Sequence, residues 1–383
     1  MDIPQNHVRR RTVVAAAVTP LASILGSGLL IIVPVLERTL GALAVFGAIA
    51  ICAVAWMLGT VIRHNLIVVE ARQAAKTLDL ATARLGRLAD AVIVIAYVIS
   101  VALYVRIMAE YLVAFFISGG SPAVEALVAC VSIAVIILIG MLRGFRGLDR
   151  LDRIALSVVL VLTAVLGSVL IASDVGGFAT GAVTVPPIPA LPIGQIFMVL
   201  GGIVITVQGF ETVRYLGADF DVATRVRASR LAQAIASFIY IGFVAVATPL
   251  MGLGTAAGAD TTLLDITARV APWLALPLVI SAVLSQFSAA IADTEAADGN
   301  LNGLNAWFHG RRPYLITGLA AIAIAATIPT LTIVAIASRA FAAYYALQCV
   351  IALRTSRRWP HRVGFGILAL AMLAVTLFAL PAG

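Results

Sequence analysis

The sequence is poor in charged residues. Only 11% of its 383 residues are Asp, Glu, Lys or Arg, whereas 62% are hydrophobic and the mean hydropathy is +1.08. A soluble domain carries about 25% charged residues, so this composition excludes an ordinary soluble protein. Apolar runs of about 20 residues, the length that crosses a bilayer, recur along the whole chain. The predicted fold class is an all-α integral membrane protein with many transmembrane helices.

Cysteine and histidine are also scarce. The three cysteines lie inside apolar stretches, where cysteine packs as a small hydrophobic residue, so neither a disulfide nor a metal site is expected. The four histidines lie in segments that we place at the cytoplasmic face, which argues against a histidine-centred mechanism within the membrane. No cofactor is expected apart from a bound sodium ion, considered below.

Hydropathy predicts eleven spans separated by connections without a soluble module. The spans cover residues 13–36, 39–62, 89–113, 122–142, 154–173, 193–218, 230–253, 270–292, 313–329, 332–353 and 363–381. If the spans alternate in direction, 21 of the 26 Lys and Arg residues lie on one side. By the positive-inside rule, this asymmetry predicts a cytoplasmic N-terminus and an extracytoplasmic C-terminus. It also explains the net charge of +8 without nucleic acid as a partner.

Composition and the two long connections give three further expectations. Lys76 is the only lysine, and a sequence rich in Arg, Ala and Val is typical of a GC-rich bacterial genome, so we expect the plasma membrane as the location. Residues 63–87 alternate apolar and charged side chains, which predicts an amphipathic helix lying at the interface. Residues 174–192 contain VPPIPALP, which predicts extended structure.

The first span, Val13 to Leu36, carries Gly26-Ser27-Gly28 near its centre, between Pro20 and Pro34. Each glycine lowers helix propensity by about 1 kcal/mol. A helix that breaks within hydrocarbon needs a polar partner for its freed backbone groups, and in transporters that partner is a substrate or an ion. The alternative is an unbroken helix that uses small residues for close packing. The glycines alone leave both readings open.

The sixth span, Ile193 to Ala218, is the second unusual element. Gln208 and Gly209 lie near its middle and are followed by Phe210, Glu211 and Arg214. A charge within a span costs about 2.5 kcal/mol or more, so it marks a candidate functional site. Glu211 and Arg214 are three residues apart and are expected to face each other on one helical turn. A structural ion pair between helices is the alternative.

The two unusual spans lie five spans apart. An odd number of crossings reverses the direction of a second copy, and paired interrupted helices are the best sequence pointer to a transporter's binding site. We therefore expect a single domain over residues 1–383 built from inverted repeats of five helices, with spans one and six interrupted. The first repeat covers residues 12–174, the second 193–354, and an extra helix covers 363–381.

Four stretches resemble the amino acid–polyamine–organocation superfamily, whose transporters share a LeuT-type fold. Gly26-Ser27-Gly28 followed by LLIIVP is similar to the family's Gly-x-Gly-Ile-Phe break in the first helix. The remaining three stretches resemble the sixth helix with its basic loop, the end of the eighth helix, and the tenth helix. They are Gly209-Phe210-Glu211 with the later TRVRASRLAQAI, SAAIADTEAADGNL from Ser288, and SRAFAAYYALQCVIALR from Ser338.

The chain departs from the family pattern at three points. The loop after Asp219 lacks the family's prolines, and the chain has eleven predicted spans rather than twelve. At the end of the eighth span, Asp293, Glu295 and Asp298 stand where a basic residue is common. These departures bear on the substrate more than on the fold.

The resemblance implies a substrate site between the first and sixth helices. Backbone N–H groups at Gly26, Ser27 and Gly28 would bind a substrate carboxylate, because the start of a half-helix carries positive dipole charge. Backbone carbonyls of the unwound sixth helix near Val207 to Phe210, which include Gln208 and Gly209, would accept from an ammonium group. Phe210 would close over the substrate, or simply pack, and Glu211 would carry a proton or link the two halves. Ser23 and Tyr104 complete the predicted set.

Ion and gate residues are also implied. Sodium-coupled relatives use oxygen ligands that correspond here to Ser23, Leu25, Ser285 and Ser288, and hard cations favour such ligands. Serines in spans also bond simply to the preceding turn, and proton coupling stays open. Near the outer end, Arg106, Glu110 and Arg339 are expected to form an outer gate. Arg214 is a further member of the predicted set of ion and gating residues. Snorkelling of the two outer arginines to the interface is the alternative.

We therefore expect a secondary active transporter of an amino acid or related small amine, driven by sodium or protons and working by alternating access. Its partners would be that molecule, the coupling cation and the lipid bilayer. Two alternatives stay open, a receptor or scaffold that binds without translocating and a membrane-embedded enzyme acting on a lipid-linked substrate. The enzyme would need clustered acids, histidines or metal ligands near one face. The acidic cluster in the eighth span has no histidine at ligand spacing, so an enzyme is not expected.

Overall fold

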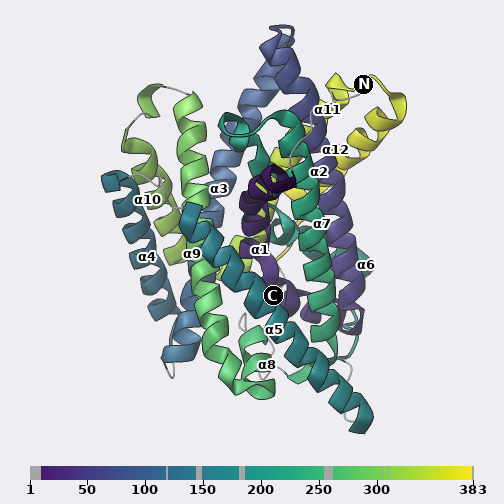
Figure 1. Cartoon of the computed structure of the whole chain (residues 1–383), viewed down its shortest axis with the longest axis vertical. Helices are drawn as coiled ribbons and strands as arrows, with labels where there is room; N and C mark the ends of the chain where they lie inside the picture. Colours follow the sequence, from purple (N-terminus) through teal and green to yellow (C-terminus); the bar gives the residue numbers. More distant parts are fainter. Residues whose placement is uncertain are drawn as a thin grey trace.

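The computed structural model describes residues 10–117, 120–143, 149–180, 186–253, 262–304, 306–308 and 310–381, and within these ranges it contains helices and no strands (Figure 1). The α-helices are α1 (Arg10–Leu40), α2 (Ala44–Ala74), α3 (Leu80–Phe116), α4 (Pro122–Arg143), α5 (Asp149–Thr180), α6 (Ile193–Gly201), α7 (Val222–Ala247), α8 (Thr262–Val270), α9 (Ala275–Leu304), α10 (Arg312–Thr327), α11 (Thr330–Thr355) and α12 (Trp359–Phe378). Short 3-10 helices are η1 (Gly41–Leu43), η2 (Val204–Val207), η3 (Phe210–Ala218), η4 (Thr248–Leu253), η5 (Pro272–Leu274) and η6 (Ala306–Phe308).

Every predicted span overlaps a helix, and the all-helical membrane fold is confirmed. Eight helical stretches of the described residues are long and apolar enough to cross a membrane, the first combining α1 and α2. Several helices exceed the predicted spans because hydropathy detects the apolar part of a helix and not its polar ends. α9 continues through Asp293 to Leu304, so the acidic cluster is helical and not part of a loop. α8 lies in a segment that we had assigned to a connection.

The first helix is not interrupted, so that prediction is wrong. α1 runs unbroken from Arg10 to Leu40 and includes both Pro20 and Pro34. Gly28 serves close packing instead. A Cβ atom on Gly28 would overlap the backbone oxygen of Thr206 in η2, and only glycine allows two backbones to approach so closely.

The sixth span is broken, as predicted. α6 ends at Gly201, and the chain continues through η2 and the non-helical pair Gln208-Gly209 into η3. Gly209 has φ +121°, a conformation that non-glycine residues rarely adopt. Two backbone N–H groups form hydrogen bonds with a carbonyl at the end of α6. Met198 O accepts from Gly202 N at 3.0 Å and from Leu380 N at 3.1 Å. The C-terminal segment therefore caps the broken helix.

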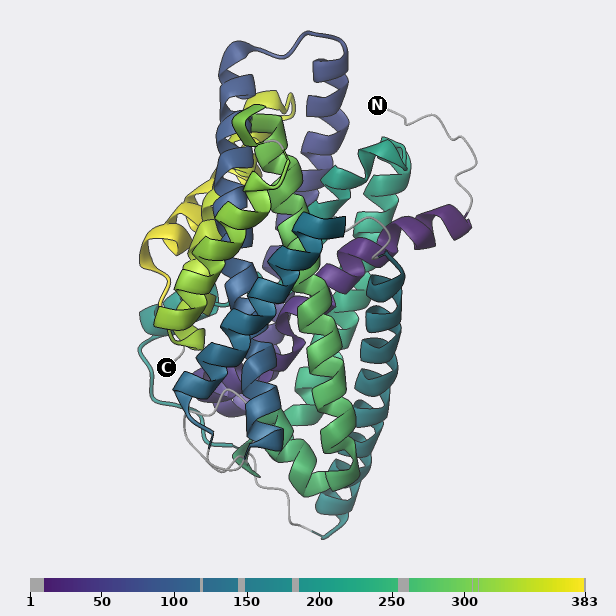
Figure 2. The ribbon, with the colours of Figure 1, turned by 90° about the vertical axis from the view of Figure 1, so that its left-hand side faces the viewer.

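The predicted interfacial helix at residues 63–87 is also wrong. α2 continues to Ala74 and α3 begins at Leu80, so the two helices form a hairpin that projects past the rest of the bundle (Figure 2). The turn places Lys76 at φ 55°, and Asp79 caps α3 by accepting from Thr82 N at 3.1 Å. In the long connection before α6, α5 extends to Thr180, whereas residues 186–192 are non-helical as expected.

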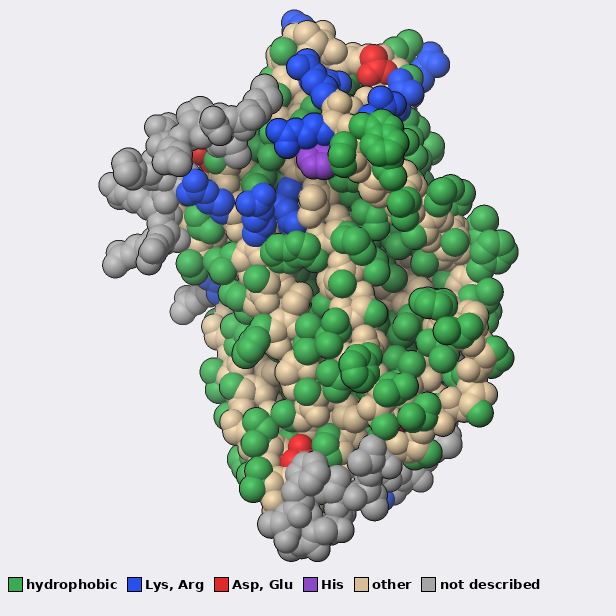
Figure 3. Space-filling view, turned by 90° about the vertical axis from the view of Figure 1, so that its right-hand side faces the viewer, with side chains coloured by type: hydrophobic (Ala, Val, Ile, Leu, Met, Phe, Trp, Pro, Cys, Tyr) green, Lys and Arg blue, Asp and Glu red, His purple; other side chains and the backbone are tan. Residues whose placement is uncertain are grey.

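α3 lies at the centre of the bundle, packed against α9 and α11, while α1 packs against α7 and α9 and α12 covers α11 (Figure 1). Tyrosines are prominent among the largest fully buried side chains, for example Tyr97, Tyr104 and Tyr345. On the outside, Lys and Arg gather toward one end of the face shown, and hydrophobic side chains cover most of the remainder (Figure 3). We call the end that carries the α2–α3 hairpin the basic end.

Candidate functional site

The break in the sixth span rests directly on α1. An ideal Cβ atom on Gly209 would lie 2.6 Å from Ser23 Oγ and 2.7 Å from Ile24 N. Gly28 makes the matching approach one helical turn further along α1 by contacting Thr206. The two unusual spans of the sequence therefore meet, and glycines on both sides make the contact possible.

Side chains from two other helices bind the backbone at this contact. Tyr240 Oη of α7 lies 2.7 Å from both Ile24 O and Thr206 O, and Gln286 Nε2 of α9 donates to Gly26 O at 2.5 Å. We missed both residues in the sequence. A glutamine within an apolar span is a detectable signal for Gln286, whereas nothing distinguishes Tyr240 from other tyrosines.

Glu211 is fully buried beside the break. Its Oε2 accepts from Gly209 N at 3.0 Å and from Tyr345 Oη at 2.8 Å, while Oε1 has no hydrogen-bond partner. Phe210 stacks on the Tyr345 ring at 5.4 Å and is only 1% exposed, as expected for a packed side chain. A buried carboxylate oxygen without a hydrogen-bond partner is energetically costly. Glu211 Oε1 can therefore accept a hydrogen bond from a further donor.

The expected pairing of Glu211 with Arg214 is wrong. Arg214 instead forms an ion pair with Asp90 of α3 at 3.4 Å and donates to Tyr344 Oη at 2.8 Å. The helical period does not explain the difference, because side chains three residues apart lie one above the other in a 3-10 helix such as η3. Competing partners separate the two residues instead, since Gly209 N and Tyr345 bind Glu211.

A second buried carboxylate, Asp293 of α9, lies close to the same break. It is 2% exposed and within hydrogen-bond distance of Ser100 on α3. The Tyr104 hydroxyl also interacts with it and accepts from Gln208 Nε2 at 2.8 Å. In the sequence, Asp293 was a departure from the family pattern and a member of the acidic cluster, because the predicted span ended at residue 292. α9 continues to Leu304, so Asp293 is a carboxylate within a long buried helix, which is a functional signal.

A cavity of ≈310 Å³ begins at this group of residues. Ser23 of α1, Thr212 of η3, and Ser288 and Asp293 of α9 line its deep part, and exposed residues such as Glu295 line its mouth toward the basic end. Its volume is within the range of small-molecule sites, about 300–1,000 Å³. Hydroxyl and carboxyl groups from three helices therefore converge on a space that opens toward one end of the bundle.

A much smaller cavity, ≈10 Å³, adjoins the first one, since Ala22 and Ser288 line both. Leu25, Gly26, Ser285 and Ser288 line it, so three of the four residues expected at a sodium site lie together. Ser23, the fourth, lines the larger cavity instead. The side chain of Ser27 lies outside the described part of the structure. Within that part, no group of three or more His, Cys, Asp and Glu residues could hold a metal ion.

Arg106 and Glu110 pair at 3.6 Å near the end opposite the basic end, and both are nearly fully buried. Thr330 of α11 bridges them by accepting from Arg106 Nε at 3.3 Å and donating to Glu110. Glu125 of α4 lies 3.8 Å from Arg106. Burial rules out snorkelling for Arg106.

Arg339 does not join this cluster, so the predicted three-residue gate is wrong in that member. Its Nε donates to Ala379 O at 2.9 Å, beside α12. An arginine within a span needs a partner at its own depth, and the backbone that follows α12 supplies one.

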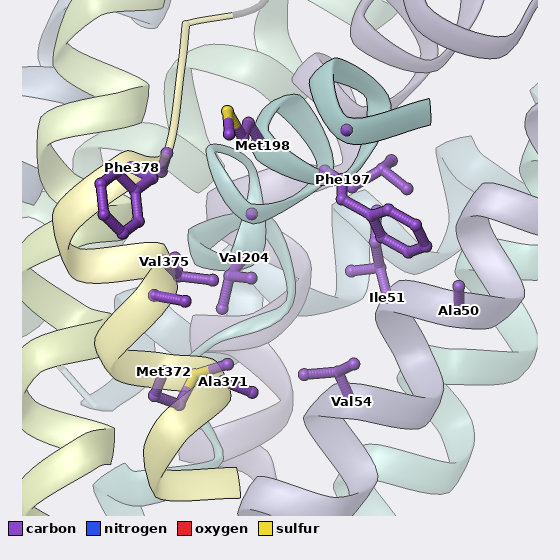
Figure 4. Close-up of a pocket in the computed structure, with 15 residues that line it drawn as sticks. Ala50, Ile51, Val54, Phe197, Met198, Val204, Ala371, Met372, Val375 and Phe378 are labelled. Atoms are coloured by element: carbon purple, nitrogen blue, oxygen red, sulfur yellow. The ribbon is translucent and has the colours of Figure 1, made fainter. Parts of the chain in front are cut away.

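An apolar cavity of ≈540 Å³ lies between α2, α6 and α12 (Figure 4). Its side chains, such as Phe197, Met198 and Val375, carry only carbon and sulfur atoms beyond the backbone. It therefore offers no side-chain group that would orient a polar substrate.

Comparisons with known proteins agree with the architecture. A family model described as an APC superfamily transporter matches residues 6–379. An uncharacterised protein of Aquifex aeolicus (strain VF5) is 32% identical over 380 residues, which cover 97% of this chain and 91% of that protein. Two crystal structures of a manganese transporter from Eremococcus coleocola have similar folds, one of a histidine-to-alanine mutant and one in complex with an aromatic bis-isothiourea substituted compound. Their TM-scores are 0.60 and 0.55 at 11% and 12% identity, over 98% of this chain and 88% of theirs.

Proposed function

Because the chain belongs to the APC superfamily of transporters, we propose that it is a secondary active transporter of an amino acid or related small amine. It works by alternating access and is driven by a sodium or a proton gradient. It is a transporter rather than an enzyme or a receptor that binds without translocation. Its partners are the small molecule, the coupling cation and the bilayer.

The cavity beside the broken sixth span is the observation that carries this proposal. It reaches from Ser23 and Asp293 to the basic end. At the opposite end, Arg106, Glu110 and Thr330 form a buried cluster. A polar site that is open toward one end and closed toward the other is what one state of an alternating-access cycle requires.

The acceptors at the break fit the ammonium group of the substrate. Glu211 Oε1 and Gln208 Oε1 are both buried acceptors without a partner. The opposite end of the substrate binds the hydroxyls of Ser23 and Thr212, because the amides near Gly26 belong to an unbroken helix and are not available as a carboxylate site.

The repeat architecture and the orientation are part of the same proposal. The first repeat covers residues 12–174, the second 193–354, and α12 is the extra helix. The break at the start of the second repeat and the contact of η2 with α1 support the pairing of the two interrupted or glycine-rich spans. The clustering of Lys and Arg at one end supports a cytoplasmic N-terminus in the plasma membrane.

The coupling ion has two candidate sites. Sodium would bind in the small cavity at Leu25, Ser285 and Ser288, whose oxygen atoms suit a hard cation. A proton would bind a buried carboxylate. Manganese, which the transporter of similar fold carries in its name, lacks a matching group of ligands in the described residues, so it enters only as a control.

Uptake into proteoliposomes tests the proposal. The probes are a radiolabelled amino acid mixture, radiolabelled putrescine and radioactive Mn²⁺, each with a sodium gradient, a proton gradient or neither. We expect gradient-dependent accumulation of an organic probe and its loss in Glu211→Gln, whereas Asp79→Asn, at the exposed turn between α2 and α3, keeps it. Binding without accumulation in correctly oriented protein would favour a receptor, and accumulation of Mn²⁺ alone would overturn the substrate class.

A further inference from the structure

Ser100 of α3 lies between two oxygen atoms. Its Oγ is 3.0 Å from the backbone oxygen of Tyr97 and within hydrogen-bond distance of Asp293 Oδ2. A serine hydroxyl has one proton to donate, and both a backbone carbonyl and an ionised carboxylate only accept. If Asp293 were ionised, one of these two contacts would hold no proton. A proton on Asp293 Oδ2 satisfies both, because Asp293 then donates to Ser100 and Ser100 donates to Tyr97.

The charges around Asp293 favour the same protonated form. From α3, Tyr97 and Tyr104 interact with it, and from η3, the carboxyl group of Glu211 does. Neither Glu211 nor Asp293 forms an ion pair within the described part of the chain. Arg214 acts on Glu211 without forming an ion pair with it, whereas the groups that act on Asp293 are Ser100, Tyr104 and Glu211. A second carboxylate beside Glu211 would be costly in this buried site, and a proton on Asp293 removes that cost.

Asp293 nevertheless has a route to water. It borders the cavity of ≈310 Å³ together with the uncharged Thr19 and Ser23 of α1. The titratable groups further along this cavity are Tyr215 and Asp219 of η3 and Glu295 of α9, toward the basic end. Asp293 therefore lies at the inner limit of a polar path, with its hydrogen-bonded side against α3 and its open side toward the cavity.

We propose that Asp293 is the coupling-proton site of this transporter, an inference that rests on the transport function proposed above. In the state with the cavity open, the O–H bond of Asp293 breaks and its proton passes to a water molecule in the cavity. Asp293 is then a carboxylate that accepts hydrogen bonds from Ser100 and Tyr104. In the state open to the other side, a proton from water on that side bonds again to the carboxylate. One proton thus crosses the membrane in each cycle.

Infrared difference spectroscopy of the purified protein tests the site without any substrate. The probe is the C=O stretch of a protonated carboxyl group, followed during a pH titration. We expect a band in the wild type at neutral pH that is absent from Asp293→Asn and present in Glu295→Gln. Ser100→Ala should keep the band and shift the pH at which it disappears, which also provides a readout if Asp293→Asn fails to fold. An unchanged band in Asp293→Asn, or an unshifted one in Ser100→Ala, would overturn the proposal.

Uptake with the same variants separates the two proposals. We expect Asp293→Asn to lose accumulation driven by a proton gradient while it still equilibrates the probe across the membrane. Proton-driven accumulation that survives in Asp293→Asn, or wild-type accumulation driven by sodium alone, would overturn the role of Asp293 and leave the transport function standing. If the wild type accumulates no probe but shows the infrared band, the transport function fails and a protonated Asp293 remains without a coupling role.

Discussion

Gly26 and Gly28 lie two residues apart on α1 but face different surroundings. A Cβ atom on Gly28 would overlap the backbone of Thr206, whereas one on Gly26 would lie 3.4 Å from Ser285 O and 3.5 Å from Ala289 Cβ, in ordinary contact. We expect Gly28→Ala to lower the free energy of unfolding by about 1–3 kcal/mol, as overpacking does. Gly26→Ala should be neutral or slightly stabilising, because alanine favours the helix. Thermal unfolding of both variants in detergent checks this, and a Gly28→Ala variant as stable as the wild type would contradict the packing role.

The sequence located this pair of glycines but could not decide what they do. A glycine weakens a helix and also allows close approach of another backbone, and both effects follow from the same missing Cβ atom. The decision depends on what lies opposite, and Thr206 is far away in the sequence. The positions of polar residues within spans were more informative, because their cost in a membrane does not depend on the partner. Glu211 was found in this way.

Tyr240 joins two elements that the sequence could not connect. Its hydroxyl lies 2.7 Å from Ile24 O of α1 and from Thr206 O of η2, and the residue is fully buried. We expect Tyr240→Phe to lower the free energy of unfolding by about 1–3 kcal/mol, because the hydroxyl proton that the two buried carbonyls share is lost. Chemical unfolding followed by tryptophan fluorescence measures this. Tyr314→Phe on α10, which is only partly buried, is the control, and an equal loss in both variants would argue against a special role for Tyr240.

Helix ends were harder to predict than helices. The charged residues of the α2–α3 hairpin and of the second half of α9 lie outside the apolar windows, yet Arg, Glu, Ala and Leu all favour a helix. These helices therefore continue beyond the apolar segment. The break of the sixth span was predictable because glycines and polar residues coincide there. The 3-10 geometry that follows the break was not predictable, because it depends on the contact with α1.

Asp79 gives the hairpin a dependence on pH. The side chain and the backbone N–H of Thr82, together with Arg354 of α11, lower the pKa of Asp79 from 3.8 to about 2. Because the folded pKa is depressed, the carboxylate stabilises the fold above pH 3.8, and this contribution is lost as pH falls toward 2. We expect the melting temperature of Asp79→Asn to fall less than that of the wild type across this interval, since asparagine still caps the helix. Parallel slopes for the two proteins would contradict the assignment.

At the scale of the whole molecule, the composition predicted the membrane class, and the residues of four short stretches predicted the family. The sequence did not predict which distant residues would meet. Arg106 and Glu110 were paired correctly because they are one helical turn apart. Their other partners, Thr330 and Glu125, come from different helices, and Arg339 was assigned to the cluster only from its depth in the membrane. Depth can be estimated from hydropathy, whereas the direction of a side chain around the helix depends on packing.

The Arg106–Glu110–Thr330 cluster closes the end of the bundle opposite the cavity, so weakening it should change which end of the site is accessible. Glu110→Gln removes the carboxylate that lies 3.6 Å from Arg106 and accepts from Thr330. A state that loses about 1.4 kcal/mol becomes about tenfold less populated relative to its alternative.

Cysteine labelling measures which end of the site is accessible. Thr212→Cys places a thiol in the deep part of the cavity. The half-buried Cys130 is replaced by serine to remove background labelling, whereas Cys52 and Cys349 are buried and stay. With the cluster intact, we expect an impermeant maleimide to label this thiol from the side of the basic end. In Glu110→Gln, labelling from that side should slow several-fold and labelling from the opposite side should appear. Glu125→Gln, which leaves the Arg106–Glu110 pair in place, is the matched control. Identical labelling rates in Glu110→Gln and its parent would mean that the closed end depends on packing around α3 and α11 rather than on this cluster.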